Sequence, residues 1–217
     1  AVLIPGKSAP KLMKKEYPAV NHVAFWHSMG SFIVRCFYAR YNDLSDSSVY
    51  MGTGGKNGAA GIGLAVADLI AAVKGGHHRS KLMDKLAFGT YNHTFEKRTS
   101  YDWLTRDQAI VDQYIADPLC GYLFTIKGMA DLLHLNTAAN SDEWYQKVRK
   151  DLPILLISGA EDPVGGYSKG IDEVYDKLIQ SGHTAVTEKL YPECRHEVLN
   201  ERNKEEVYKY LYSYIIK

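Results

Sequence analysis

The sequence has few cysteines and almost no excess of one charge. Its 217 residues include only three cysteines, Cys36, Cys120 and Cys194, an odd number spaced far apart. Such a set argues against a disulfide framework and is typical of a reducing compartment. No Cys-x-x-Cys pair occurs, so a structural zinc site is not expected. The formal net charge of +1, without long runs of Lys and Arg, gives no electrostatic reason to expect a nucleic-acid partner.

Long apolar runs are absent as well. No stretch reaches the roughly 18 apolar residues that a membrane-spanning helix requires, so no transmembrane segment is expected. The apolar run at residues 2–4 is too short for a signal peptide, although a signal peptide that had been removed would leave no trace. Together with the cysteine content, this predicts a cytoplasmic protein. The 46% of apolar residues still suffice for a sizeable core, in one domain or a domain with an insertion.

Strands and helices alternate towards both ends of the sequence. Apolar runs predict strands, and apolar residues at helical spacing predict helices. The strands are predicted at residues 22–26, 48–51, 153–158 and 185–191, and the helices that follow most of them at 31–41, 171–181 and 205–216. This alternation is typical of an α/β fold with a parallel sheet covered by helices.

The middle of the sequence interrupts this alternation. From about residue 57 to 146 the pattern is helical or irregular, with no clear strand. We therefore expect an α/β core formed by residues 1–56 and 147–217, and a helical cap inserted between them at residues 57–146.

Ser28 directly follows the first of these strands and precedes a helix. A nucleophile elbow has this order, because its sharp turn exposes the serine hydroxyl at the carboxyl edge of the sheet. The N–H of Met29, at the start of the helix, would then stabilise a developing oxyanion. Of the pattern Gly-x-Ser-x-Gly only Gly30 is present, since Trp26 occupies the first glycine position. The pattern alone leaves open an ordinary Ser-Gly turn.

Two further polar residues follow later strands. Asp162 comes just after the strand at 153–158, and His196 just after the strand at 185–191. Each has a simpler interpretation by itself, as a turn residue and as a surface histidine, and Glu161 competes as the acid. The order Ser, Asp, His at strand ends is nevertheless the order of α/β hydrolases. It favours Ser28 as nucleophile, His196 as general base and Asp162 as the acid that orients the histidine.

Six motifs together resemble the lysophospholipase and monoacylglycerol-lipase branch of the α/β hydrolases, which is grouped with the S33-type serine aminopeptidases. They lie at residues 25–31, 52–55, 102–107, 117–121, 157–165 and 191–197. The resemblance extends from about residue 11 to the end of the sequence. It implies an α/β-hydrolase fold that hydrolyses carboxylic esters, small or lipid-derived, through an acyl-enzyme and without a cofactor.

The resemblance also implies a substrate cavity beneath the helical cap. Trp103, Leu104 and Phe124 would line its acyl-binding part, although ordinary core packing explains each of them equally well. Trp26, as a large residue at a glycine position, would narrow the cavity or alter the elbow.

The part before the elbow departs from the family pattern. Family members have a longer segment there, which contributes the first strands and a loop N–H that completes the oxyanion hole, whereas 27 residues precede Ser28 here. We therefore expect an N-terminally shortened sheet, with an N–H near Gly6 or Lys7 as a substitute donor. An exposed sheet edge would favour homo-oligomers.

Two other functions remain open at this point. A hydrolase-like scaffold that binds without catalysing would follow from an incomplete oxyanion hole. A serine aminopeptidase would need an acidic group near the cavity to hold the substrate's amine, and the sequence does not locate one. No nucleotide cofactor is expected at Gly52–Gly58, because the acidic partner of a dinucleotide fingerprint is missing. No metal site is expected at His77 and His78, because adjacent residues do not share a helix face.

Overall fold

The computed structural model describes residues 8–216 and contains a parallel sheet in the order β1-β2-β3-β4. The strands are β1 (Val23–His27), β2 (Ser47–Met51), β3 (Ile154–Gly159) and β4 (Val186–Tyr191). All four predicted strands are confirmed, with ends that differ by at most one residue. The run at residues 2–4 and the proposed donor near Gly6 or Lys7 lie outside the described residues.

The position of β3 in the sheet follows from its sequence. All six residues of Ile154–Gly159 are buried, and an apolar run without alternation is typical of a parallel strand covered on both faces. β3 pairs with β2 on one side and β4 on the other. β1 pairs only with β2 within residues 8–216. Pairing of this edge with a second copy stays a prediction, which a monomer in sedimentation at high concentration would contradict.

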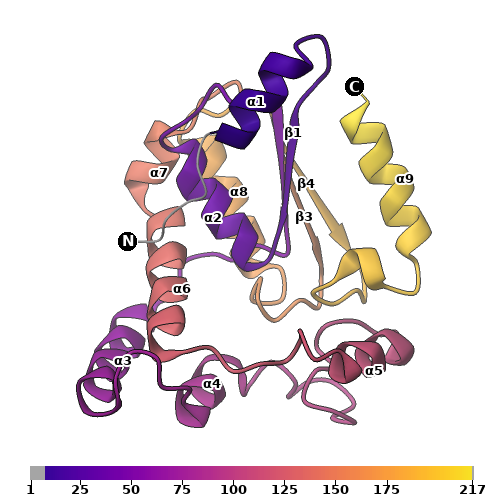
Figure 1. The fold of residues 1–217 in the computed structure, drawn as a ribbon. Coiled ribbons are helices and arrows are strands. Elements are labelled where there is room, and N and C mark those ends of the chain that lie inside the picture. Colours follow the sequence, from indigo (N-terminus) through magenta and orange to yellow (C-terminus); the bar gives the residue numbers. More distant parts are fainter. Residues whose placement is uncertain (1–7, 217) are drawn as a thin grey trace.

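Helices cover both faces of the sheet (Figure 1). Apolar side chains of α2 (Met29–Tyr38), α7 (Asp142–Lys147) and α8 (Lys169–Gln180) pack with Tyr50, Ile154 and Leu156 on one face. Those of α9 (Lys204–Ile215) pack with Val49, Leu155 and Ile157 on the other. The alternation of β3 side chains between the two clusters follows from the period of two in a strand. The core elements are completed by α1 (Ser8–Glu16) and the short η1 (Val198–Asn200).

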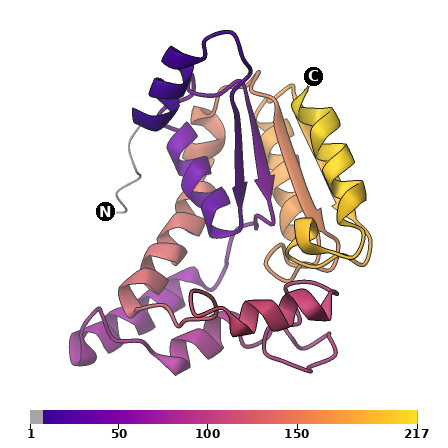
Figure 2. The ribbon, with the colours of Figure 1, turned by 45° about the vertical axis from the view of Figure 1, so that its right-hand side comes forward.

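The middle of the chain forms a separate helical layer. Figure 2 shows this layer beyond the carboxyl ends of the strands, the edge at which open α/β sheets bind ligands. It contains α3 (Ala60–Lys74), α4 (Lys81–Phe88) and α5 (Gln108–Ala116), while α6 (Ile126–Ala139) leads from it back to α2. Among these residues the only β-type pairing is an isolated bridge between Arg79 and Thr125. The expected lack of strands in this segment is confirmed.

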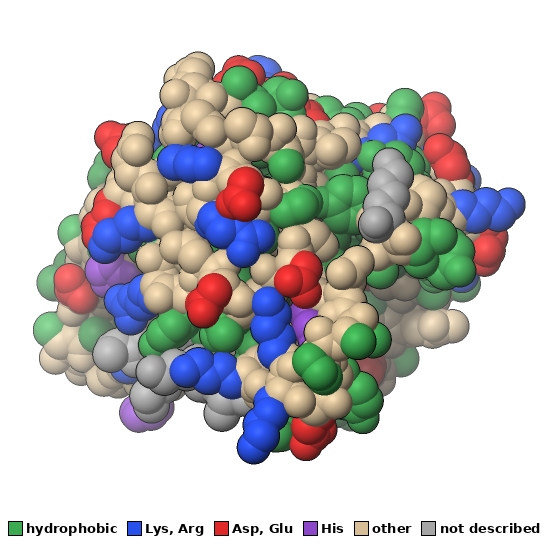
Figure 3. All heavy atoms as spheres, turned by 90° about the horizontal axis from the view of Figure 1, so that it is seen from above, with side chains coloured by type: hydrophobic (Ala, Val, Ile, Leu, Met, Phe, Trp, Pro, Cys, Tyr) green, Lys and Arg blue, Asp and Glu red, His purple; other side chains and the backbone are tan. Residues whose placement is uncertain are grey.

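The end of the molecule opposite the helical layer has no large surface area of a single charge sign. Figure 3, viewed onto that end, shows Lys and Arg side chains interspersed with Asp and Glu. This distribution agrees with the small net charge. None of the helices within residues 8–216 is long and apolar enough to cross a membrane.

Candidate active site

Ser28 occupies a strained turn between β1 and α2. Its backbone has φ 52° and ψ −126°, a region that non-glycine residues rarely adopt and that costs roughly 1–3 kcal/mol. Hydrogen bonds hold the turn in place: Ser28 N–H donates to the Met51 carbonyl at 2.9 Å, and the Ser28 carbonyl accepts from Ser31 N–H at 2.9 Å. Strand, strained serine and helix therefore have the geometry of a nucleophile elbow.

His196 and Asp162 form a buried hydrogen-bonded pair. His196 Nδ1 lies 2.9 Å from Asp162 Oδ2, and the two residues are 2% and 0% exposed. The carboxylate also accepts hydrogen bonds from Ser158 Oγ at 3.0 Å and from Val164 N–H at 2.8 Å. With three donors directed at it, the carboxylate is held in one orientation, and it fixes the ring of His196. The competing acid, Glu161, is exposed.

The ring of His196 is also packed between neighbours. Its centroid lies 4.5 Å from that of His27 and 5.2 Å from that of Trp103. Gly52 leaves room for it: this residue has φ +57°, and a Cβ there would lie 2.9 Å from His196 Cε1 and 3.2 Å from His27 Cδ2. A side chain at position 52 is therefore excluded both by the backbone conformation and by the two rings.

His27 is a site residue that the sequence analysis did not identify. Its Nε2 lies 3.3 Å from the backbone oxygen of His196. Burial, and to a smaller extent the positive charge that His196 can carry, lower the pKa of His27 to about 3. His27 is therefore a neutral ring beside His196 near neutral pH. Its position next to Ser28 in the elbow was the only signal in the sequence.

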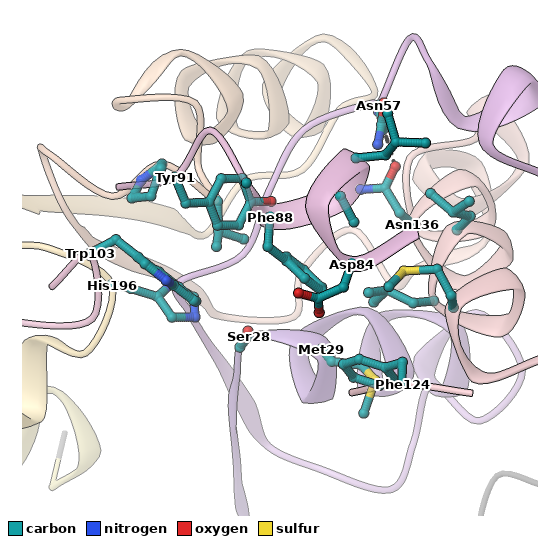
Figure 4. A pocket seen from close by; sticks show the side chains of 18 of the residues that line it. Ser28, Met29, Asn57, Asp84, Phe88, Tyr91, Trp103, Phe124, Asn136 and His196 are labelled. Atoms are coloured by element: carbon teal, nitrogen blue, oxygen red, sulfur yellow. Dashed lines mark hydrogen bonds between the residues drawn. The ribbon is translucent and has the colours of Figure 1, made fainter. Parts of the chain in front are cut away.

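Ser28 and His196 open into one cavity of about 1150 Å³ (Figure 4). Met29, at the start of α2, lines it as well, so the first turn of that helix faces the space where a substrate carbonyl would lie. Within the described chain, no hydrogen bond joins Ser28 Oγ to His196; such contacts are often long before a substrate binds.

The helical layer supplies much of the cavity wall. Trp103, Leu104 and Phe124 all line the cavity, and their contact with an acyl chain stays a prediction. Aromatic rings continue from the core into this layer: Trp103 lies 5.2 Å from Tyr91, Tyr91 lies 5.7 Å from Phe88, and Phe88 lies 6.2 Å from Phe124, measured between centroids. Because Trp103 also contacts His196, this aromatic row runs from the histidine to the far part of the cavity.

Of the two expectations for Trp26, narrowing of the cavity is not found, and an effect on the elbow stays a prediction. This residue is 44% exposed and is not among the residues that line the cavity. Its ring packs over Gly30 at the start of α2, where a Cβ would lie 3.2 Å from Trp26 Cε3. Trp26 lies in β1, two residues before Ser28. Because the side chains of a strand alternate between the two faces of a sheet, the Trp26 ring lies on the face that α2 covers. Trp26 therefore does not narrow the cavity.

A buried arginine ties the aromatic row to the histidine loop. Arg195, next to His196, donates to the Asp102 carbonyl at 2.7 Å and pairs with Glu96 at 2.8 Å. Glu197 N–H donates to the Leu104 carbonyl at 2.8 Å. The segment that carries Trp103 is therefore fixed to the loop that carries His196. No pattern in the sequence indicated this contact, which joins residues 93 positions apart.

The glycine-rich segment after β2 serves packing. A Cβ on Gly54 would lie 2.7 Å from the Val164 carbonyl, and one on Gly55 would lie 2.9 Å from the Cα of Gly170. These glycines let the segment approach the loop before α8 and the first turn of α8 itself. Within residues 8–216, no group of three or more His, Cys, Asp or Glu is placed to hold a metal ion.

The sequence matches the family described as serine aminopeptidase, S33, over residues 7–203. The chain belongs to this S33 family. A monoacylglycerol lipase from Mycolicibacterium smegmatis is 26% identical over 204 residues, which cover 93% of this chain and 64% of that relative. The chain thus spans less than two thirds of the length of this curated relative.

Solved structures of similar proteins share the fold of this chain. A carboxyl esterase from Bacillus coagulans, solved with glycerol, is 29% identical with a TM-score of 0.87, covering 96% of this chain and 68% of that one. A monoglyceride lipase from Saccharomyces cerevisiae is 15% identical with a TM-score of 0.67, covering 96% of this chain and 65% of that one, and it shares the fold. The fold is that of the α/β hydrolases, and the chain is similar to esterases and monoacylglycerol lipases.

Proposed function

We propose that this chain hydrolyses carboxylic esters through an acyl-enzyme formed on Ser28. The observation that carries the proposal is the pair of Asp162 and His196, joined at 2.9 Å, with His196 and the strained Ser28 lining the same cavity. A nucleophile, a base and an orienting acid at three strand ends are the groups that acyl transfer requires.

In the proposed reaction, Ser28 Oγ attacks the ester carbonyl while His196 accepts the serine proton. His196 then donates this proton to the leaving alcohol, and a water molecule hydrolyses the acyl-enzyme by the reverse sequence. Asp162 stabilises the imidazolium and holds its tautomer. The N–H of Met29 donates to the oxyanion, and loss of one such donor typically costs about 10²–10³ in turnover.

We further propose that residues 57–146 act as a cap over the core formed by residues 1–56 and 147–217. Trp103, Leu104 and Phe124 would then contact the acyl chain, with Phe88 and Tyr91 between them along the aromatic row. An elongated apolar wall of this kind favours an acyl chain of some length over an acetyl group. The two relatives named as a monoacylglycerol lipase and a carboxyl esterase make glycerol monoesters a suitable first substrate class.

The test is hydrolysis of p-nitrophenyl esters from acetate to laurate, with Ser28→Ala measured in parallel. We expect turnover that increases towards medium chains and disappears in the variant. Amino-acid p-nitroanilides belong in the same panel, and their preferential cleavage would replace the esterase proposal by an aminopeptidase.

Labelling by a fluorophosphonate distinguishes an enzyme from a scaffold that only binds. A reactive elbow forms a covalent adduct on Ser28, detected as a mass increase that is absent in Ser28→Ala. An unlabelled wild-type protein would indicate a non-catalytic scaffold.

A further inference from the structure

Asp84 places a carboxylate in a largely apolar part of the cavity. It lies in the first turn of α4 and lines the cavity together with Met83, Phe88 and Phe124. Figure 4 shows its side chain directed into the cavity. Burial raises the pKa of this carboxyl group, as is usual for a carboxylate removed from water without a compensating charge.

Asp84 differs from the other carboxylates that line the cavity. Glu173 forms an ion pair with Lys177 at 2.7 Å, and Glu197 accepts a hydrogen bond from Asn200 at 2.7 Å. For the side chain of Asp84, the described residues provide neither a hydrogen bond nor an ion pair within 4 Å. The neighbouring Lys85 is exposed and does not neutralise it.

The helix dipole favours a carboxylate in the first turn of α4, but the N-cap of this helix does not need an aspartate at position 84. Ser80 caps α4, since its Oγ accepts from Met83 N–H at 3.3 Å. The carboxylate of Asp84 is not used by this cap. Asp84 is half-buried, and no described side chain pairs with it, so its position in the cavity leaves the carboxylate free for a partner that arrives with the ligand.

Aromatic rings surround the same position. Phe88 is one turn further along α4 and therefore on the same face as Asp84. Phe124 lies 6.2 Å from Phe88 between ring centroids. Tyr101 also lines the cavity, and burial and the negative charge of Asp84 raise its pKa. A carboxylate among aromatic faces is the chemistry that binds alkylammonium groups.

We propose that Asp84, with Phe88 and Phe124, forms a subsite for an alkylammonium group, so that the enzyme prefers esters that carry this cation. This inference rests on the proposed esterase function and adds a substrate class to it. The aromatic row links the subsite to His196, so one end of the ester would bind at Ser28 and its cationic end at Asp84. A metal ion does not fit there, because a single carboxylate supplies too few oxygen ligands.

The kinetic test compares two butyrate esters of nearly the same shape. Choline butyrate carries a trimethylammonium group, and 3,3-dimethylbutyl butyrate carries a neutral tert-butyl group in its place. We expect the cationic ester to have the higher kcat/KM in the wild type, by about 10–100-fold. Asp84→Asn should remove this preference by lowering the kcat/KM of the cationic ester more than that of the neutral ester.

Asp68→Asn serves as the matched control. Asp68 is an exposed aspartate of α3 in the same helical layer and does not line the cavity. It should retain the full preference for the cationic ester. If Asp84→Asn turns over both esters with the wild-type ratio, the subsite proposal is wrong.

A binding measurement tests the subsite without catalysis. In the Ser28→Ala background, calorimetric titration with choline butyrate and with its neutral isostere should show at least about tenfold tighter binding of the cation, and Asp84→Asn should abolish the difference. Equal affinities would overturn the subsite. A clear binding preference in a wild-type protein that hydrolyses neither ester would instead overturn the esterase proposal and retain the subsite.

Discussion

The two halves of the candidate site are built differently. Asp162 and His196 follow the neighbouring strands β3 and β4 and are almost fully buried, with every carboxylate contact within 3.0 Å. Ser28 follows β1, at the edge of the described sheet, and the next residue, Met29, is 37% exposed.

This difference corresponds to the two tasks that the proposed mechanism assigns to His196 and Ser28. A base must be held in one tautomer, and hydrogen bonds within a dry environment do this. A nucleophile must reach the substrate, so its turn is held by the backbone while its hydroxyl stays free. We therefore expect changes in the buried half to reduce both stability and activity, and changes at the serine to reduce activity alone.

The largest expected effect is that of Ser28→Ala on turnover. Loss of the nucleophile should lower kcat by about 10⁶-fold, while the urea midpoint of unfolding stays near that of the wild type. Ser213→Ala, an exposed serine of α9, is the matched control and should retain full activity. Ester hydrolysis by Ser28→Ala well above the level left by a loss of about 10⁶-fold would exclude Ser28 as the nucleophile.

Asp162→Asn should affect both properties. An amide can no longer orient His196 correctly, and in Ser-His-Asp sites this change lowers kcat by about 10⁴-fold. It also weakens buried hydrogen bonds, so we expect a free energy of unfolding lower by about 1–3 kcal/mol. Glu161→Gln, at the exposed neighbour, should change neither quantity. A stability equal to that of the wild type in Asp162→Asn would remove the contrast between the two halves.

Gly52→Ala tests whether packing positions the histidine. The new Cβ would lie 2.9 Å from His196 Cε1, at a φ that disfavours it. Displacement of the ring should lower kcat by about 10²-fold and the free energy of unfolding by about 1–3 kcal/mol. Gly58→Ala is the control, because its Cβ would have no neighbour within 4 Å. Equal kinetics in the two variants would show that the ring is free to adjust.

The neutral His27 predicts a pH dependence of stability. The unfolded chain protonates His27 below about pH 6.5, whereas the folded chain, facing His196 and Asp162, does so only near pH 3. The unfolded state therefore binds more protons in between, and stability decreases as the pH falls from 6.5. Relative to His27→Gln, the wild type should lose about 1–3 kcal/mol between pH 7 and 4.5. The free energies of unfolding are measured with urea at both pH values. An equal change between the two pH values in the wild type and in His27→Gln would contradict this prediction.

The smallest effect is expected for Trp26→Gly. Because Trp26 packs on Gly30 outside the cavity, the acyl-length preference should stay unchanged and kcat/KM should remain within about threefold. Phe88→Ala, which enlarges the cavity itself, is the comparison and should move the optimum towards longer chains. A shift of the optimum in Trp26→Gly would show that this side chain does influence the substrate site.

The strands and the order of the site residues were predictable because their signals are local. Apolar runs bounded by turns located β1 to β4, and residues just beyond parallel strands meet at one sheet edge wherever the rest of the chain lies. The resemblance to a family then indicated a helical layer over that edge. The orientation of Trp26 was missed because a glycine position in a motif does not reveal which face a substituted side chain occupies.

By itself, the sequence determined an α/β sheet, the succession of Ser28, Asp162 and His196, and an interposed helical segment. Only the tertiary structure decided which side chains surround them. His27 meets His196 across 169 positions, Arg195 holds Asp102 across 93, and Asp84 comes to lie in the cavity without a partner. These contacts depend on how distant segments pack and how much water they exclude, and no local pattern of residues records either quantity.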